Sequence, residues 1–341
     1  MSFELCRQPR APLEHSAPRG EIRRVHRAFA FPFLLLVSAC TSRSDQAVHG
    51  GRDTLVVFEA SSLSGAMLVA LDSFSRRSDP SAVVMEEHGA SLELARRITE
   101  LGRVPDVIAL ADQEVFPQLL VPGATRWYAA FARNRMVVAY TARSRHAAEI
   151  TPSNWRSVLL RADVLVGRTD PVLAPAGYRA LLLYKLAESF YRDPGLATRL
   201  EARTPPRLMR GNASELAALL SAGELDYIIE YESLARAQEL RFIPLPAEID
   251  LGDARLADAY AAASVRIARG KDTVEIHGAP ILYGISVPTN APHAAVGHRF
   301  LRFLFGPAGL AILRASNVDA LDTLVLHGDS VPAAIHPVTP K

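Results

Sequence analysis

Cysteine is almost missing from this chain of 341 residues, which contains only Cys6 and Cys40. Both lie within the first 40 residues, so the rest of the chain has no thiol. Such a chain cannot build a disulfide framework, use a thiol nucleophile or bind zinc through cysteine. These three chemistries are therefore excluded for residues 41–341.

The chain also lacks a strong net charge and a long hydrophobic run. Its 38 basic and 36 acidic residues give +2, of which residues 1–39 contribute +3 through six Arg and three Glu. A near-neutral body offers no basic surface for nucleic acid. The longest apolar run, FAFPFLLLVSA, is shorter than the roughly 20 residues that cross a bilayer. With 49% hydrophobic and 22% charged residues, the composition is typical of a globular protein with roughly two domains.

Several catalytic motifs are missing as well. The sequence contains no GxSxG nucleophile turn, no HExxH metal motif, no GxGxxG turn and no phosphate-binding P-loop. These absences argue against a hydrolase, a metalloprotease, a dinucleotide-dependent enzyme and a nucleotide hydrolase. We therefore predict that the chain is not an enzyme.

The first 40 residues follow the order of a secretory signal. RRVHR (23–27) is basic, FAFPFLLLV (29–37) is apolar, and VSAC (37–40) places small residues before a cysteine. The segment resembles a bacterial lipoprotein signal, which implies that residues 1–39 are removed and Cys40 is acylated. Residues 40–53 would then form a polar tether. The alternative is a chance apolar stretch that ends in an ordinary cysteine.

The body alternates strand-like and helix-like segments. The apolar runs TLVVFEA (54–60), AVVMEEHG (82–89) and PDVIALA (105–111) are separated by two amphipathic stretches. RNRMVVAYTA (133–142) is predicted to be one longer strand, and a second α/β cycle follows it. A third strand-like run, APILYGISVP (279–288), precedes two terminal helices. Two α/β cycles joined by two crossings predict two lobes with a cleft between them.

Two serine-containing turns lie where a predicted strand ends and a helix begins. Ser61 and Ser62 follow the first strand, and Ser91 follows Gly89 in the second turn. A serine in this position either caps the helix or, together with free backbone N–H groups, binds an oxyanion. Neither turn carries Lys or Arg, so an anion site here would suit a small, fully ionised oxyanion.

Two further segments are expected to face the same cleft. In the segment from Pro175 to Tyr178, the proline suits the first helical turn and Gly177 would allow a ligand to approach closely. Tyr178 is either a core residue or a ligand contact. Glu230 follows an apolar strand-like run, and it is either a ligand-site carboxylate or an ordinary salt-bridged or solvated glutamate.

Several motifs together resemble one family, the tungstate/molybdate-binding proteins of ABC importers, over nearly all of residues 54–320. The motifs are ASSLSG, GAS with RRITELG and PDVIALAD, FARNRMVVAYT, GRTDPVLAPAGYRALLLYKLAE, ELDYIIEYES and PILYGISVPTNAP. The resemblance implies an α/β type II periplasmic-binding-protein fold with a central cleft and a hinge of two strands. One lobe would comprise residues 54–135 and 282–341, and the other residues 136–281.

The resemblance also implies roles for individual residues. Glu230 would be a direct ligand of the molybdenum or tungsten atom, a hard centre that accepts oxygen ligands. The remaining contacts to the oxyanion would come from Ser61, Ser62, Ser91, the backbone around Ala174, Pro175 and Ala176, and Tyr178.

At one position the chain departs from the family pattern. The family usually reads Asp-Pro-x-Gly-Tyr-Arg, with an aspartate three residues before the glycine, and this aspartate supplies a second carboxylate. This chain has Ala174 at that position. Asp170, four residues earlier, is a possible substitute ligand.

The resemblance implies a periplasmic, lipid-anchored and monomeric solute-binding protein. It would capture tungstate or molybdate, use no cofactor, and deliver the anion to the permease and ATPase subunits of an ABC transporter. Three alternatives stay open: the same fold binding sulfate or phosphate, an enzyme acting on a small anionic substrate, and a sensor or scaffold lipoprotein that transports nothing.

Overall fold

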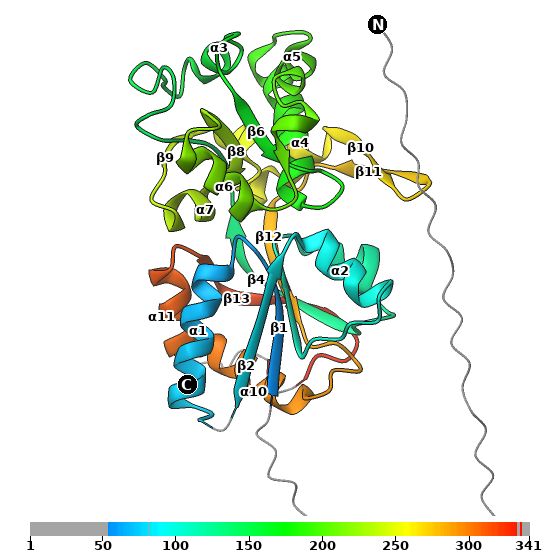
Figure 1. Ribbon diagram of the computed structural model, residues 1–341. Coiled ribbons are helices and arrows are strands. Elements are labelled where there is room, and N and C mark those ends of the chain that lie inside the picture. Colours follow the sequence, from blue (N-terminus) through cyan, green and yellow to red (C-terminus); the bar gives the residue numbers. More distant parts are fainter. Residues whose placement is uncertain (1–53, 81, 333–334, 336–341) are drawn as a thin grey trace, which may run out of the picture. The chain divides into compact units, whose positions relative to one another are not determined.

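Two mixed β-sheets, each covered by helices, account for most of the residues that the computed structural model describes, namely 54–80, 82–332 and 335 (Figure 1). These residues belong to one unit that begins at Gly50. The predicted signal segment, the predicted tether and Cys40 lie outside the described residues. The predicted α/β architecture with two sheets is confirmed.

The first lobe contains a six-stranded sheet in the order β13-β4-β12-β3-β1-β2. β1 is parallel to β2 and β3, whereas β12 is antiparallel to β3 and β4. The strands are β1 (Thr54–Ala60), β2 (Val83–Gly89), β3 (Val107–Leu110), β4 (Trp127–Asn134), β12 (Ile281–Ser286) and β13 (Asp319–Gly328). The helical segments are α1 (Ser64–Arg77), α2 (Ser91–Thr99), η1 (Phe116–Leu120), α10 (Ala294–Leu304) and α11 (Pro307–Ala315).

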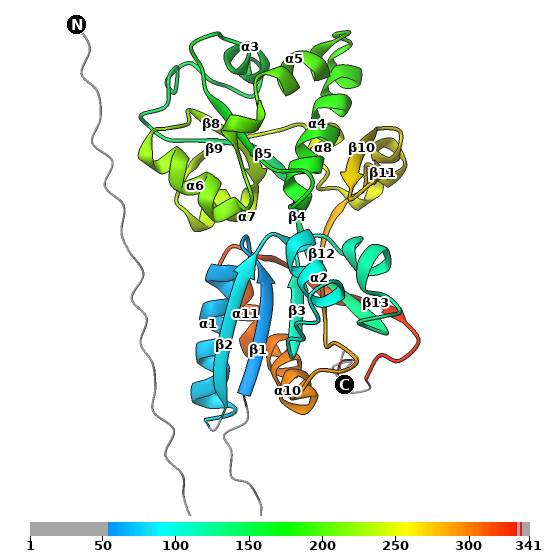
Figure 2. The same cartoon turned by 45° about the vertical axis from the view of Figure 1, so that its right-hand side comes forward.

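The second lobe contains a five-stranded sheet in the order β7-β6-β8-β5-β9, drawn in green in Figures 1 and 2. The strands are β5 (Met136–Tyr140), β6 (Val166–Thr169), β7 (Met209–Arg210), β8 (Tyr227–Tyr231) and β9 (Arg241–Pro244). The helical segments are α3 (Trp155–Leu159), α4 (Pro175–Tyr191), α5 (Leu196–Ala202), η2 (Pro206–Leu208), α6 (Ala213–Ala222), α7 (Glu232–Ala237), α8 (Ala247–Asp250), η3 (Ala254–Leu256) and α9 (Ala257–Ala261).

Burial on both faces explains why the central strands are apolar throughout. Along β8, alternate side chains enter different clusters: Tyr227 and Ile229 pack in one core, and Ile228 packs with Leu216 and Leu220 of α6 in the other. Burying a leucine side chain of this kind stabilises the fold by roughly 1.5–3 kcal/mol. The alternation leaves Glu230 at the end of β8, next to the helices rather than in solvent.

The chain crosses between the lobes at Arg135, and here one prediction is wrong. Residues 133–142 were predicted to form one strand, but β4 ends at Asn134 and β5 begins at Met136. β4 pairs with β12 and β13 in the first sheet, whereas β5 pairs with β8 and β9 in the second. The apolar pattern of the run does not reveal which partners its two halves find, and only the family resemblance placed a lobe boundary between residues 135 and 136.

Several elements were not predicted, among them three strands. β10 (Ser264–Arg269) and β11 (Asp272–His277) form a separate antiparallel hairpin, shown in yellow beside α4 in Figure 2. The chain returns to the first lobe directly after this hairpin, through residues 278–280 into β12. β13 was also missed, because it follows the two terminal helices as an edge strand beside β4.

Candidate functional site

A small cavity of about 20 Å³ lies between the lobes, where strands end and helices begin. Its lining includes the first residues of α2, α4 and α6, together with the turn before α1. Free backbone N–H groups and the positive ends of helix dipoles gather at such positions. The lining residues are Ala60, Ser61, Ser62, Gly89, Ala90, Ser91, Ala111, Thr169, Ala174, Pro175, Ala176, Asn212, Ala213, Glu230 and Tyr231.

The first serine turn does not use Ser61 or Ser62 as a helix cap. α1 begins at Ser64, and the residue before it, Leu63, makes no side-chain cap. The backbone N–H of Ser61 donates to the Gly89 carbonyl oxygen at 2.9 Å, which joins the two serine-containing turns. The Ser61 hydroxyl is buried and has no partner among the described residues, so it is available to a ligand.

Ser91 holds the second turn in place. Its Oγ accepts a hydrogen bond from the backbone N–H of Ala111 at 3.0 Å, and the residue is buried. A serine hydroxyl that accepts one hydrogen bond still has its own hydrogen to donate. The residue before α2 is Ala90, which offers no side-chain cap, so the cap interpretation fails here too.

The start of α4 contributes backbone rather than polar side chains. Ala174 precedes the helix, Pro175 is its first residue, and Ala174 and Ala176 are both buried against the cavity. A β-carbon added at Gly177 would lie 2.5 Å from the Thr169 carbonyl oxygen. Gly177 therefore allows the start of α4 to pack closely against the chain's own backbone. The sequence had indicated instead that this glycine allows a ligand to approach.

Asp170 does not line the cavity. Its Oδ1 accepts the backbone N–H of Val172 at 2.8 Å, and its backbone carbonyl oxygen accepts from Ala174. The carboxylate thus stabilises the turn that leads into α4. The suggestion that it replaces the missing second carboxylate stays a prediction.

Glu230 is the carboxyl group of the cavity, and it is fully buried. Oε1 accepts the backbone N–H of Tyr231 at 3.0 Å, whereas Oε2 has no partner among the described residues. Burial raises the pKa of this carboxyl from about 4.5 to about 8, although the bond from Tyr231 lowers it slightly. A fixed, desolvated carboxyl of this kind can act as an oxygen ligand once it has lost its proton.

Sequence reasoning missed several residues of the lining. Thr169 ends β6, and its buried hydroxyl has no partner among the described residues. Asn212 precedes α6, and its side chain accepts from the Glu215 backbone N–H at 3.0 Å. The spacing N-x-x-E is a recognisable sign of a helix start, so this third helix terminus could have been found. Thr169 carries no comparable local signal.

Tyr178 does not line the cavity either, but it connects the lobes beside it. Its hydroxyl donates to the carboxylate of Asp112, which follows β3 in the first lobe. Burial, followed by the nearby Asp112 charge, raises the pKa of Tyr178 well above its usual value, so the phenol stays protonated. Its predicted role as a direct ligand contact stays a prediction.

The same aspartate forms an ion pair across the lobes with Arg179, at 2.7 Å between Nη2 and Oδ2. Both side chains are almost fully buried, and Arg179 also donates to the Ala279 carbonyl oxygen at 2.7 Å. Burial by itself lowers the pKa of the guanidinium, but Asp112 together with Tyr231 and Tyr178 outweighs burial, and the net direction is upward. The positive charge is therefore neutralised by Asp112 rather than offered to the cavity.

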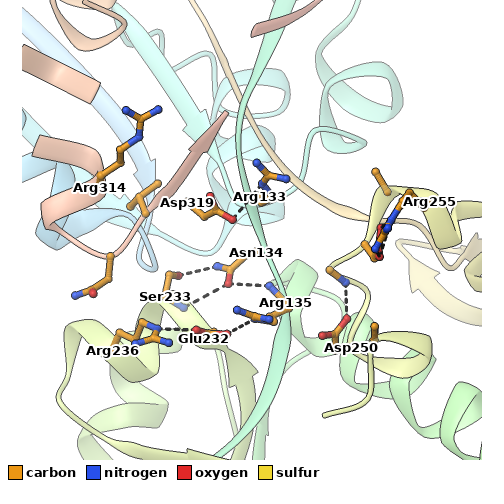
Figure 3. Close-up of a pocket in the computed structure, with 16 residues that line it drawn as sticks. Arg133, Asn134, Arg135, Glu232, Ser233, Arg236, Asp250, Arg255, Arg314 and Asp319 are labelled. Atoms are coloured by element: carbon orange, nitrogen blue, oxygen red, sulfur yellow. Dashed lines mark hydrogen bonds and ion pairs between the residues drawn. The ribbon is translucent and has the colours of Figure 1, made fainter. Parts of the chain in front are cut away.

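A larger pocket of about 780 Å³ lies at the crossing at Arg135 (Figure 3). Its charged residues are mostly paired: Glu232 accepts from both Arg135 and Arg236, and Arg133 lies 3.1 Å from Asp319. The pocket contains none of the residues that the sequence indicated as ligand contacts. It is a polar groove in which most charged side chains are paired with one another.

Two further features are absent from the described ranges. Over these residues, no helix combines the length and hydropathy needed to cross a membrane. Nor do three or more His, Cys, Asp or Glu side chains of the same ranges come together in a way that could hold a metal ion.

The chain is similar to known binding proteins. The model of a family described as bacterial extracellular solute-binding protein matches residues 55–316. An uncharacterised solute-binding protein of Petrotoga mobilis is 39% identical over 271 residues, which are 79% of this chain and 84% of that protein. The molybdate/tungstate-binding protein WtpA of Pyrococcus abyssi is 32% identical over 333 residues, covering 90% of this chain and 95% of the relative.

A solved structure shares the fold. The periplasmic molybdate-binding protein of Azotobacter vinelandii superposes with a TM-score of 0.56 over 77% of this chain and 98% of its own. At 16% sequence identity, this similarity concerns the fold alone.

Proposed function

The chain belongs to the bacterial extracellular solute-binding protein family, and from this premise we propose that its solute is tungstate or molybdate. We further propose that a lipid on Cys40 anchors the protein outside the cytoplasmic membrane. In this proposal the protein acts as a monomer, needs no cofactor, and passes the anion to the permease and ATPase subunits of an ABC transporter.

Membership of this family confirms two predictions made from the sequence. The fold is that of type II periplasmic binding proteins, as the similarity to the Azotobacter protein also indicates. The chain is a binding protein rather than an enzyme.

One observation carries the choice of ligand. Three buried oxygens without a partner among the described residues line the same cavity: Ser61 Oγ, Thr169 Oγ1 and Glu230 Oε2. Two of them are hydroxyl donors and the third belongs to a carboxyl group. Native structures leave few buried polar atoms without partners, so such a cluster supports a polar ligand.

In its ionised form, the carboxyl group favours a metal oxyanion over sulfate or phosphate. A carboxylate repels an ordinary anion, whereas a molybdenum or tungsten atom of high charge accepts hard oxygen ligands in addition to its oxo groups. The hydroxyls and helix N-termini would meanwhile donate to the oxo groups. The name of the Pyrococcus relative supports the same ligand.

Calorimetric titration of the purified protein with tungstate, molybdate, sulfate and phosphate tests this proposal. We expect tungstate or molybdate to bind and sulfate and phosphate not to. The variant Glu230→Gln should weaken binding at least tenfold, whereas Glu224→Gln, at an exposed site in the turn after α6, should leave it unchanged. Binding of sulfate or phosphate without binding of tungstate and molybdate would refute the proposal and support the alternative ligand class.

The proposed anchor is tested separately, because Cys40 lies outside the described residues. We expect the natural chain to sediment with membranes and to be extracted by detergent. Cys40→Ala should appear in the soluble fraction with unchanged affinity for the oxyanion. A variant that still sediments with membranes would contradict lipid attachment at Cys40.

A further inference from the structure

A buried chain of hydrogen bonds connects Ser62 to both crossings between the lobes. Tyr283 lies on β12 just after the second crossing, is fully buried, and donates its hydroxyl hydrogen to Ser62 Oγ at 3.1 Å. Asn134 is the last residue of β4 and lies at the first crossing. Its Nδ2 donates to the Tyr283 hydroxyl oxygen at 2.5 Å. Ser233 of α7 lies 3.2 Å from the same oxygen.

The orientation of the Asn134 amide is determined by its neighbours. Its Oδ1 accepts two backbone N–H groups, from Arg135 at 2.9 Å and from Ser233 at 3.3 Å (Figure 3). A reversed amide would point its own hydrogens at these donors. Nδ2 therefore faces Tyr283 and Ser233 Oγ, which is 2.7 Å away.

The Asn134 amide donates to the oxygens of both Tyr283 and Ser233. The Tyr283 hydroxyl has a single hydrogen and donates it to Ser62 Oγ, so the contact between Ser233 and Tyr283, in which either hydroxyl could be the donor, runs from Ser233 to the tyrosine oxygen. Burial raises the pKa of Tyr283, which keeps this hydrogen in place at neutral pH. Ser62 cannot donate back to Tyr283, so its hydrogen is free for the cavity that it lines.

We propose that Tyr283 is a positioning residue, which holds Ser62 as a hydrogen-bond donor to a fully ionised oxyanion. Asn134 supplies a fixed donor to the tyrosine oxygen, and a chain of aligned donors strengthens each bond in it. The inference rests on the proposed function, because it takes Ser62 as a contact of the bound anion.

A double-mutant cycle with tungstate and molybdate as titrants tests the inference. We expect Tyr283→Phe to weaken binding roughly tenfold in the natural background, since it removes the bond that orients a donor to a charged group. It should weaken binding equally in the Ser62→Thr background, which keeps a hydroxyl. In the Ser62→Ala background, Tyr283→Phe should have no further effect.

The control is Tyr260→Phe, which removes another buried tyrosine hydroxyl, one that donates to the Ala247 carbonyl oxygen away from the cavity lining. It should leave the affinity for both anions unchanged. A purely structural role for Tyr283 would instead weaken binding by the same factor whether or not Ser62 retains its hydroxyl, and that result overturns the inference. Failure of the natural protein to bind either anion overturns the proposed function, and this inference with it.

A second variant covers the case in which Tyr283→Phe does not fold. Ser233→Ala removes one of the two donors to Tyr283 and leaves Asn134 in place. We expect it to weaken tungstate binding about threefold in the natural background and not at all in the Ser62→Ala background. Equal loss in both backgrounds overturns the inference.

Discussion

At the scale of single residues, the proposed role of Glu230 as a ligand comes with a cost in stability. Its carboxyl group is fully buried in a cavity that no Lys or Arg side chain among the described residues lines. The ionised form is therefore disfavoured in the folded protein, as its raised pKa shows. A residue placed for binding in this way destabilises the protein when it is charged.

We expect Glu230→Gln to be more stable than the natural protein, and increasingly so as pH rises. The folded pKa of about 8 exceeds the unfolded value of about 4.5, so the natural protein loses stability between these two pH values. Glutamine does not titrate, and the difference should grow by about 1.4 kcal/mol per pH unit within this window. Urea unfolding at pH 5 and pH 8 measures it, and a difference independent of pH would contradict the prediction.

Ala174 is the residue at which the chain departs from the family pattern, and it lines the cavity together with Glu230. We expect Ala174→Asp to raise the affinity for tungstate about tenfold, or about 1.4 kcal/mol, by supplying a second carboxylate. Without an anion, two carboxyl groups in one cavity should lower stability at pH 8. Ala174→Asn is the matched control, because it can cap α4 equally well but brings no charge. Equal affinities of the two variants in calorimetric titration would contradict this role.

At the scale of elements, the start of α4 is placed by a glycine. A β-carbon at Gly177 would lie 2.5 Å from the Thr169 carbonyl oxygen and 2.6 Å from the Asp170 carbonyl carbon. Both neighbours are backbone atoms, which cannot rotate away. The close approach of α4 to the end of β6 therefore depends on glycine at this position.

We expect Gly177→Ala to lower the free energy of unfolding by about 1–3 kcal/mol and to weaken tungstate binding, because α4 must move away from the cavity. Gly65→Ala provides the comparison. Gly65 lies in the first turn of α1 with no atom within 4 Å of an added β-carbon, so alanine there should stabilise the protein by about 0.5–1 kcal/mol. Urea unfolding measures the change in the free energy of unfolding for both variants. If both substitutions stabilise the protein, or both destabilise it, the prediction is contradicted.

At the scale of the whole molecule, the ion pair of Asp112 and Arg179 joins the two lobes. Removing one partner of a buried pair leaves an uncompensated charge, at a cost of about 3–5 kcal/mol. Tyr178 donates a hydrogen bond to the same Asp112 carboxylate that pairs with Arg179. The arrangement of the lobes described here thus depends on a few buried polar groups as well as on apolar contacts.

We expect Arg179→Met to lower the free energy of unfolding by about 3–5 kcal/mol and the double variant with Asp112→Asn to recover part of this loss. Arg314→Met, which removes an exposed pair with Asp322, should cost less than about 1 kcal/mol. Chemical denaturation of these three variants and of Asp112→Asn alone makes the comparison. A double variant as unstable as the sum of its single variants would contradict a direct interaction.

The sequence by itself determined the class of fold and indicated seven of the fifteen residues that line the cavity. Hydrophobic periodicity identified the main strands and helices, and serines or small residues at strand ends indicated Ser61, Ser62, Ser91 and the start of α4. These features are local, because a strand end and the following helix start are neighbours in the chain. Cavity-lining positions next to such turns can therefore be predicted from the sequence without knowledge of the tertiary structure.

Only the tertiary structure decided which groups meet across the lobes. It placed Tyr178 against Asp112, Gly177 against backbone, and Tyr283 against Ser62, a residue 221 positions away. It also divided residues 133–142 between two sheets. A side chain's identity gives its donors and acceptors, but its partner depends on which distant segment packs beside it, and no local pattern carries that information.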